Sequence, residues 1–258
     1  MARVNCPLVT IVVPSFNQGC YLEAALQSIF EQDVPLEVFV LDGGSTDNSA
    51  AIIDRWRPRL AWARSAPDAG QSAAINEGIS LGTASYVYWL NSDDLLLPGG
   101  LRTLIAALDA QPDVPVAYGN VWNLDQVSQK RRPVWVQPFS ERALARRCII
   151  SQPGALIRRS AWEAVSGLDD KLKMAMDYDL WWKLYKQIGP FTFVNAFVAI
   201  NREHSDTKTS SFRSRHYHEA INVVRRYHHS VPLKWWIYQP YAVWWKALKR
   251  KMERSKNH

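Results

Sequence analysis

The first 115 residues alternate between segments with strand patterns and segments with helical patterns. Short apolar runs rich in β-branched or aromatic residues predict strands near 8–13, 36–41, 60–63 and 86–90. The segments between and after them predict helices over 20–30, 48–56, 71–79 and 98–110. This order predicts an α/β fold with a Rossmann-like, mostly parallel sheet and helices on both of its faces.

The chain is less regular after residue 115. Strands are predicted near 116–118, 155–157 and 191–194, and helices over 140–147, 160–165 and 178–187. From residue 212 the pattern becomes helical and basic. We therefore expect one domain over 1–211, divided near residue 115 into two halves (about 1–115 and 116–211), and a helical C-terminal extension over 212–258.

The composition is that of an ordinary globular protein, with 47% hydrophobic and 21% charged residues in 258. Three cysteines without CxxC spacing predict neither a disulfide framework nor a cysteine zinc site, and they favour a reducing compartment. The sequence contains no run of about 18 apolar residues, so no transmembrane helix is predicted. The apolar run near the N-terminus has the pattern of a strand rather than of a signal peptide. These features predict a cytoplasmic protein.

Most of the positive charge lies at the C-terminus. Residues 231–258 contain seven Lys or Arg residues and one Glu, so they carry +6 of the formal net charge of +7. The remaining 230 residues are nearly neutral, and nucleic acid is therefore not an expected partner.

The same segment has the pattern of an interfacial helix. Apolar residues recur at helical spacing and basic residues fill much of the remainder: Tyr241, Trp245, Leu248 and Met252, with Lys246, Lys249, Arg250 and Lys251. Each basic residue near an anionic membrane contributes ~1 kcal/mol. We expect the extension to bind an anionic membrane surface on the cytoplasmic face. The alternative is a helix that packs on the domain with a solvated basic face.

Three polar clusters follow predicted strands: Pro14-Ser15-Phe16-Asn17, Asp42-Gly43-Gly44 and Asn91-Ser92-Asp93-Asp94. The carboxyl ends of parallel strands lie at one edge of a sheet, where ligands bind. We therefore expect these clusters to form one site.

The adjacent carboxylates Asp93 and Asp94 repel each other and require a counter-charge. Mg²⁺ or Mn²⁺, bound by these oxygens and by substrate phosphates, would supply it. Alternatively, the pair binds no metal: one aspartate caps the following helix and the other is exposed to solvent. Asp42, before two glycines, could accept hydrogen bonds from a nucleoside base or ribose, or could simply form a turn.

Other polar residues allow two interpretations each. Asp68 and Gln71 lie where a helix begins, which suits capping and also the binding of a polar ligand. Asp177 and Asp179 lie at the start of an aromatic helix. One of them could be a general base, or both could simply be stabilised there by the helix dipole. His204 follows a strand and could bind a metal or phosphate, or be solvated.

Five motifs, in order and spacing, resemble family 2 glycosyltransferases: VPSFN at 13–17, DGGSTD at 42–47, PDAGQSAAIN at 67–76, WLNSDD at 89–94 and MDYDLW at 176–181. The resemblance covers about 8–211. It implies the GT-A fold, with a nucleotide-binding half over about 1–115 and an acceptor-binding half over 116–211. It also implies transfer of a sugar with inversion.

The resemblance implies roles for individual residues. The nucleoside would contact Pro14, Ser15, Asn17 and Asp42. Asp93 and Asp94 would form the metal-and-diphosphate motif, with Asp94 the more direct metal ligand, and Asp177 would be the catalytic base. Two positions depart from the family's pattern, because Asn91 and Met176 stand where an acid is frequent. The second departure leaves Asp179 as a competitor for the base.

We expect an inverting, metal-dependent glycosyltransferase that uses a nucleotide-diphosphate sugar donor and a saccharide or lipid-linked saccharide acceptor. Synthesis of cell-surface polysaccharide or glycolipid would be its context. One alternative is a catalytically inactive, nucleotide-sugar-binding partner in a polysaccharide assembly complex. A sugar-phosphate nucleotidyltransferase is disfavoured, because the first strand is not followed by a Gly-rich, basic loop.

Overall fold

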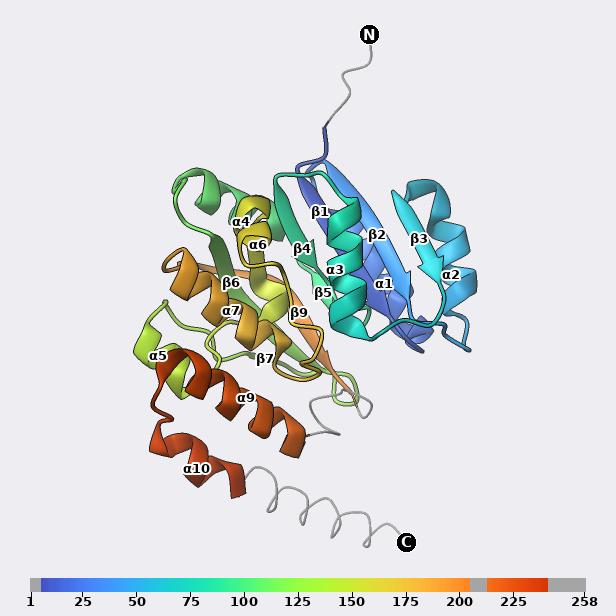
Figure 1. Cartoon of the computed structure of the whole chain (residues 1–258). Helices are drawn as coiled ribbons and strands as arrows, with labels where there is room; N and C mark the ends of the chain where they lie inside the picture. The colour runs from blue at the N-terminus through green and yellow to red at the C-terminus, as the bar shows by residue number, and fades with distance from the viewer. Residues whose placement is uncertain (1–5, 205–212, 241–258) are drawn as a thin grey trace, which may run out of the picture.

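A computed structural model describes residues 6–204 and 213–240, and within it the strands form one sheet (Figure 1). The strand order is β3-β2-β1-β4-β8-β6-β9-β5, and β7 pairs with β6 outside this path. The strands are β1 (Val9–Ser15), β2 (Leu36–Asp42), β3 (Trp62–Ser65), β4 (Tyr86–Trp89), β5 (Leu95–Leu96), β6 (Val116–Asp125), β7 (Arg131–Pro133), β8 (Ala155–Arg158) and β9 (Thr192–Glu203).

The helices occupy the connections predicted for them. They are α1 (Gly19–Phe30), α2 (Ser49–Trp56), α3 (Gln71–Leu81), α4 (Gly100–Asp109), α5 (Glu141–Arg146), α6 (Arg159–Ala164), α7 (Met176–Gln187), α9 (Arg213–His228) and α10 (Leu233–Pro240), with short 3₁₀ turns at Arg57–Arg59 and Gln152–Gly154. The predicted α/β fold is therefore confirmed.

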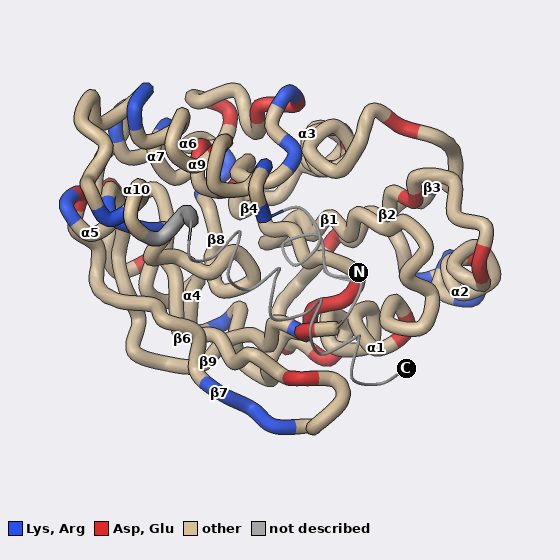
Figure 2. The backbone as a smooth tube through the Cα atoms, turned by 90° about the horizontal axis from the view of Figure 1, so that it is seen from below, with Lys and Arg blue, Asp and Glu red and all other residues tan. Residues whose placement is uncertain are grey.

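The sheet separates two hydrophobic cores. Side chains alternate across a strand, so Val12 of β1 packs in the core shared with α3, α6 and α7, whereas Ile11 and Val13 pack in the core shared with α1 and α4. Figure 2 shows α3, α6 and α7 above β1 and β4, and α1 below them. β3, β2, β1 and β4 are mutually parallel, so their carboxyl ends meet at one edge.

The second half differs from the prediction in the length of its strands, and it contains antiparallel pairs. β8 runs antiparallel to β4 and β6, and β6 and β9 continue well beyond the short strands predicted there. Their pairing shifts register at 119–121. A side chain at Gly119 would come within 2.8 Å of the Ala196 carbonyl oxygen, so the strands approach closely where the apolar pattern is interrupted.

The described part of the C-terminal extension packs on the domain. Apolar residues of α9 (Ala220, Ile221, Val223 and Val224) belong to the same core as α7. Trp235 of α10 is buried, and its indole N–H donates a hydrogen bond to the Ala145 carbonyl oxygen at 2.8 Å. The interfacial helix predicted from Tyr241 onward lies outside the described residues. Within the described ranges, no helix has the length and apolar character needed to cross a membrane.

Candidate functional site

A cavity of about 560 Å³ opens at the carboxyl ends of β1, β2 and β4 and is bordered by the start of α7. Seven residues that the sequence predicted for the site line it: Pro14, Ser15, Asp68, Gln71, Asp93, Asp94 and Asp177. Polar and charged residues that were not singled out also line it, namely Gln18, Gln152, Lys173 and Asn201. The topology thus brings residues from distant parts of the chain together around one cavity.

Asp93 and Asp94 follow β4 in different environments. Asp94 is 2% exposed, and its carboxylate accepts hydrogen bonds from the Arg202 backbone N–H (3.2 Å) and the Asn91 side-chain amide (3.2 Å). Burial and the neighbouring Asp93 charge raise the pKa of Asp94 well above its usual value. Asp93 is less buried and accepts a hydrogen bond from the Gln18 amide at 3.2 Å. Two crowded carboxylates at the cavity wall favour the binding of a cation.

His204 contacts the Asp93 carboxylate. Its Nε2 is 3.1 Å from Asp93 Oδ2, and its ring packs on Tyr21 with centroids 4.6 Å apart. The imidazole is therefore close to the carboxylate pair, although it is not among the residues that line the cavity. Arg202, two residues before His204 and within β9, donates from its guanidinium to the Asp93 carbonyl oxygen and from its backbone to Asp94. This cation partly offsets the paired negative charge.

Asp42 shapes the turn after β2. It is fully buried, and its carboxylate accepts hydrogen bonds from the Ser65 hydroxyl (2.6 Å), from the Ser45 hydroxyl and from the backbone N–H of Ser45 (2.8 Å). It does not line the cavity. Asn17 likewise holds a turn, because its side-chain oxygen accepts the Thr46 N–H at 2.8 Å. Both residues fix the loops that follow β1 and β2 beside the cavity.

Asp68, which precedes α3, and Gln71, its first residue, line another part of the cavity. The expected side-chain cap is not formed, since Gly70 precedes the helix and Asp68 accepts the Gly70 N–H at 2.8 Å. The Gln71 amide donates to the Asn91 side-chain oxygen at 2.7 Å. Asn91, which stands where the family frequently has an acid, therefore links Gln71 to Asp94 through its amide.

Asp177 lines the cavity from the first turn of α7. Its carboxylate accepts the Tyr178 N–H at 2.8 Å. Burial raises its pKa above the ordinary aspartate value, and this effect outweighs the Tyr178 N–H and the nearby His216, which act in the opposite direction. A half-buried carboxylate with a raised pKa, at a cavity wall, is suited to accept a proton.

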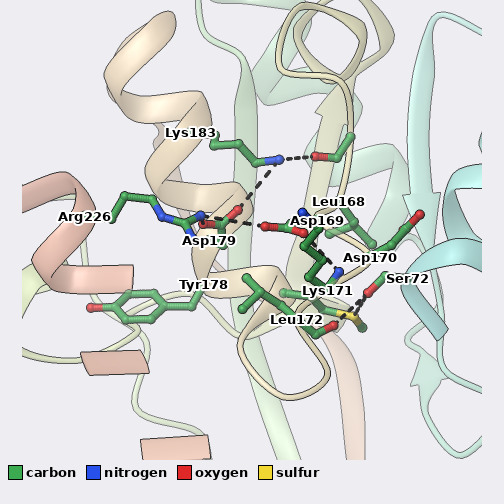
Figure 3. A network of polar contacts seen from close by, with 12 residues as sticks. Ser72, Leu168, Asp169, Asp170, Lys171, Leu172, Tyr178, Asp179, Lys183 and Arg226 are labelled. Carbon is green, nitrogen blue, oxygen red and sulfur yellow. Dashed lines mark hydrogen bonds and ion pairs between the residues drawn. The ribbon is translucent and has the colours of Figure 1, made fainter. Parts of the chain in front are cut away.

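Asp179 points to a different neighbourhood, toward α9 (Figure 3). Its side chain is 1% exposed and accepts hydrogen bonds from Arg226 Nη1 and the Tyr227 hydroxyl, both at 3.1 Å. Lys183 Nζ lies 3.7 Å away. Burial raises its pKa despite these cations. Asp179 is not among the residues that line the cavity.

Lys173 is the residue that sequence reasoning missed most clearly. Of the described residues that line the cavity, it is the one cation, and its Nζ donates to the Ala69 carbonyl oxygen at 2.9 Å. It lies in an irregular loop before α7, where no periodic pattern or motif marks it. Only the fold brings this loop against the segment before α3.

The comparisons with known proteins agree with this geometry. The family model described as "Glycosyl transferase family 2" matches residues 10–165, more than half of the chain. The chain belongs to this family. The match includes the strand-end clusters and the Asp93–Asp94 pair but ends before α7.

Relatives of known function are larger proteins. The chain is 25% identical over 224 residues to the chondroitin synthase of Escherichia coli, covering 84% of this chain and 32% of that protein. It is 27% identical over 200 residues to the hyaluronan synthase of Pasteurella multocida, covering 76% of this chain and 20% of that protein. The chain therefore spans a third or less of the length of these relatives.

Solved structures show the same fold. S. aureus TarS 1–349 in complex with UDP-GlcNAc has a TM-score of 0.70 at 19% identity, covering 88% of this chain and 68% of that one. The mannosyltransferase PcManGT from Pyrobaculum calidifontis, in complex with GDP-Man and Mn²⁺, has a TM-score of 0.64 at 23% identity, covering 85% and 65%. The GT-A type fold expected from the sequence is confirmed.

Proposed function

We propose that this chain is an inverting glycosyltransferase that transfers a sugar from a nucleotide-diphosphate donor to an acceptor hydroxyl. The observation that carries this proposal is that Asp93, Asp94 and Asp177 line one cavity. Membership of family 2 supports it. So do the folds of the relatives solved with UDP-GlcNAc and with GDP-Man.

The nucleotide would occupy the part of the cavity formed by the β1 and β2 strand ends. Pro14 and Ser15 would contact the nucleoside, with Asp68 and Gln71 on the adjoining wall. Ser15 Oγ is buried and makes no hydrogen bond to any described residue, as expected of a hydroxyl whose partner is a ligand. Asn17 and Asp42 would act by holding the surrounding turns.

A divalent cation, Mn²⁺ or Mg²⁺, fits the carboxylate pair. Within the described ranges, no group of three His, Cys, Asp or Glu side chains could hold a metal alone. Asp94 and Asp93, with His204 behind them, would therefore bind it together with the donor's diphosphate, the arrangement that Mg²⁺ favours. The bound cation would offset the charge that develops on the departing diphosphate. The raised pKa of Asp94 marks a site where a positive charge relieves repulsion.

Asp177 would act as the general base. Its ionised carboxylate takes the proton of the acceptor hydroxyl as that oxygen forms a bond to the anomeric carbon. The bond from the anomeric carbon to the diphosphate oxygen breaks on the opposite face, which inverts the configuration. Asp177 is the carboxylate that lines the cavity on α7, whereas Asp179 is paired with α9.

The acceptor would be a saccharide or a lipid-linked saccharide, and the context would be synthesis of polysaccharide or glycolipid. The likeness to chondroitin and hyaluronan synthases supports this context.

The C-terminal extension would place the enzyme on the cytoplasmic face of an anionic membrane. The apolar side chains of Leu233, Trp236 and Ile237 on α10 are exposed, and the basic segment 246–256 follows them.

Vesicle co-sedimentation tests the membrane proposal. A variant with Leu233→Ser, Trp236→Ser and Ile237→Ser should bind anionic vesicles less than the wild type does. Leu81→Ser, which removes an exposed apolar side chain from α3, is the matched control and should bind as the wild type does. Equal binding by the triple variant and the wild type would contradict the proposal.

Donor titration tests the main proposal. A panel of nucleotide sugars should be titrated against the wild type and Asp94→Ala, with and without Mn²⁺, and release of nucleotide diphosphate should be followed. One donor should bind in a metal-dependent manner, and Asp94→Ala should abolish that dependence. If no nucleotide sugar binds to the wild type under either condition, the proposal is wrong.

A further inference from the structure

A side chain from α9 holds the backbone that leads into α7. The N-cap residue Ala175 supplies no side-chain acceptor. Oε2 of Glu219 accepts hydrogen bonds from the backbone N–H groups of Lys173 (3.1 Å), Met174 (2.8 Å) and Ala175 (3.1 Å), which precede the first helical residue, Met176. One carboxylate from α9 thus satisfies three consecutive amides before α7.

Glu219 is itself fixed in place. It is buried, and Arg215, one turn earlier on α9, donates from Nε to its Oε1 at 2.8 Å. Burial opposes ionisation of Glu219, but Arg215 and the three amides outweigh it, so the pKa lies below the ordinary glutamate value. The carboxylate is therefore ionised at neutral pH and makes charge-assisted hydrogen bonds, which are stronger than neutral ones.

The segment that Glu219 holds is part of the cavity wall. Lys173 and Met174 line the cavity, and Asp177 follows one turn later. Lys173 also joins this wall to the opposite loop through its hydrogen bond to the Ala69 carbonyl oxygen. A shift of the 173–175 backbone would therefore move both the Lys173 side chain and the start of the helix that carries Asp177.

α9 holds α7 at a second point as well. Arg226 and Tyr227 bind Asp179, two residues after Asp177. Figure 3 shows the Arg226 side chain reaching Asp179. Contacts before and after Asp177 restrict both the translation of α7 along its axis and its rotation about that axis. Preorganisation of this kind contributes to catalysis, because small errors in the placement of a catalytic group are costly.

We propose that Glu219 is a positioning residue, which fixes the 173–175 segment and the first turn of α7 so that the Asp177 carboxylate faces the cavity. The proposal rests on the proposed role of Asp177 as the base. It makes α9 a part of the catalytic unit, although α9 lies outside both the matched family region and the domain expected from the sequence. A helix that only braces the fold would affect stability without a specific effect on turnover.

Glu219→Ala and Glu219→Gln in the full chain test the proposal. Glu219→Ala should lower kcat about 10- to 100-fold, the scale expected when a reacting group is misplaced. The KM for the nucleotide sugar should change little. Hydrogen exchange of the amides at 173–175 should accelerate. Glu219→Gln, which retains one carbonyl acceptor, should lie between the wild type and Glu219→Ala in both measurements.

Val224→Ala is the matched control. Val224 is fully buried on α9 in the core shared with α7, and its truncation loosens the packing without removing the Glu219 acceptor. At a similar loss of thermal stability, Val224→Ala should retain kcat. Equal losses of kcat in Val224→Ala and Glu219→Ala would overturn the proposal, as would unchanged amide exchange in Glu219→Ala. A wild type that transfers no sugar would instead refute the proposed function, which the same assay reveals before any variant is compared.

Discussion

The two aspartates of α7 lie two residues apart, on different sides of the helix, and their surroundings differ. The Asp179 side faces α9, where Arg226, Tyr227 and Lys183 surround the carboxylate. The Asp177 side faces the cavity, where the carboxylate accepts one N–H, from Tyr178. Burial raises the pKa of both groups. The difference teaches that burial alone does not mark a base: the partners of Asp179 tie it to the fold, whereas the exposure of Asp177 to the cavity leaves it available to a substrate.

Replacing each aspartate by its isosteric amide should separate the two sides most strongly. Asp177→Asn should lower turnover by ~10²–10⁴-fold, the range for a positioned general base. Asp179→Asn keeps the shape of a side chain that does not reach the cavity, so its turnover should stay within about tenfold of the wild type. Initial rates of nucleotide diphosphate release with a saturating acceptor measure both. Comparable losses in the two variants would remove the distinction.

Truncating each aspartate should separate the two sides in stability. Asp179→Ala leaves the Arg226, Tyr227 and Lys183 donors without this acceptor, and it should lower the free energy of unfolding by about 1–3 kcal/mol. Asp177→Ala removes an acceptor from one backbone N–H and should cost less. Urea denaturation followed by tryptophan fluorescence gives both values. A larger loss for Asp177→Ala would contradict the comparison.

The pH dependence of turnover should report Asp177. The base acts when ionised, so kcat should fall as the pH falls through its pKa. Burial raises that pKa, and the midpoint should therefore lie above the ordinary aspartate value of 3.8. The Tyr178 N–H and His216 on α9 oppose this shift. A midpoint at or below the ordinary value would show that the carboxylate is not desolvated in the working enzyme.

The smallest effect should appear in the stability of Asp177→Asn. A carboxyl group with a raised folded-state pKa stabilises the fold below its unfolded-state pKa, and this contribution is lost as the pH rises through the folded-state value. At neutral pH the buried charge is therefore a cost that the amide removes. Asp177→Asn should melt at a slightly higher temperature than the wild type at pH 7, and the difference should shrink toward pH 4. A lower melting temperature at pH 7 would indicate that the charge has a stabilising partner.

The first half of the molecule could be predicted because its information is local. The strand and helix patterns lie in sequence order, and parallel strands place Pro14, Ser15, Asp93 and Asp94 at one edge without further knowledge. The same logic could not show that Asp42 is enclosed by the Ser45 and Ser65 hydroxyls, since those contacts depend on how the turns fold back.

The second half depends on contacts between distant segments. The difference in surroundings between Asp177 and Asp179 depends on α9, whose Arg226 lies 47 residues beyond Asp179 in the chain. The contacts of Glu219 with the amides before α7 and the position of Lys173 are equally non-local. No local pattern in the sequence before α7 indicates that a glutamate of a later helix binds these amides.

The central claim is that Asp177 removes the proton of the acceptor hydroxyl, whereas other residues of the same cavity bind the donor. The most direct test measures donor binding and sugar transfer on the same samples of wild type and Asp177→Asn, with Mn²⁺ and the donor identified by titration. The account predicts equal donor affinity in the two proteins and loss of transfer in Asp177→Asn. Full transfer by Asp177→Asn would contradict it, and so would a loss of donor binding that matches the loss of transfer.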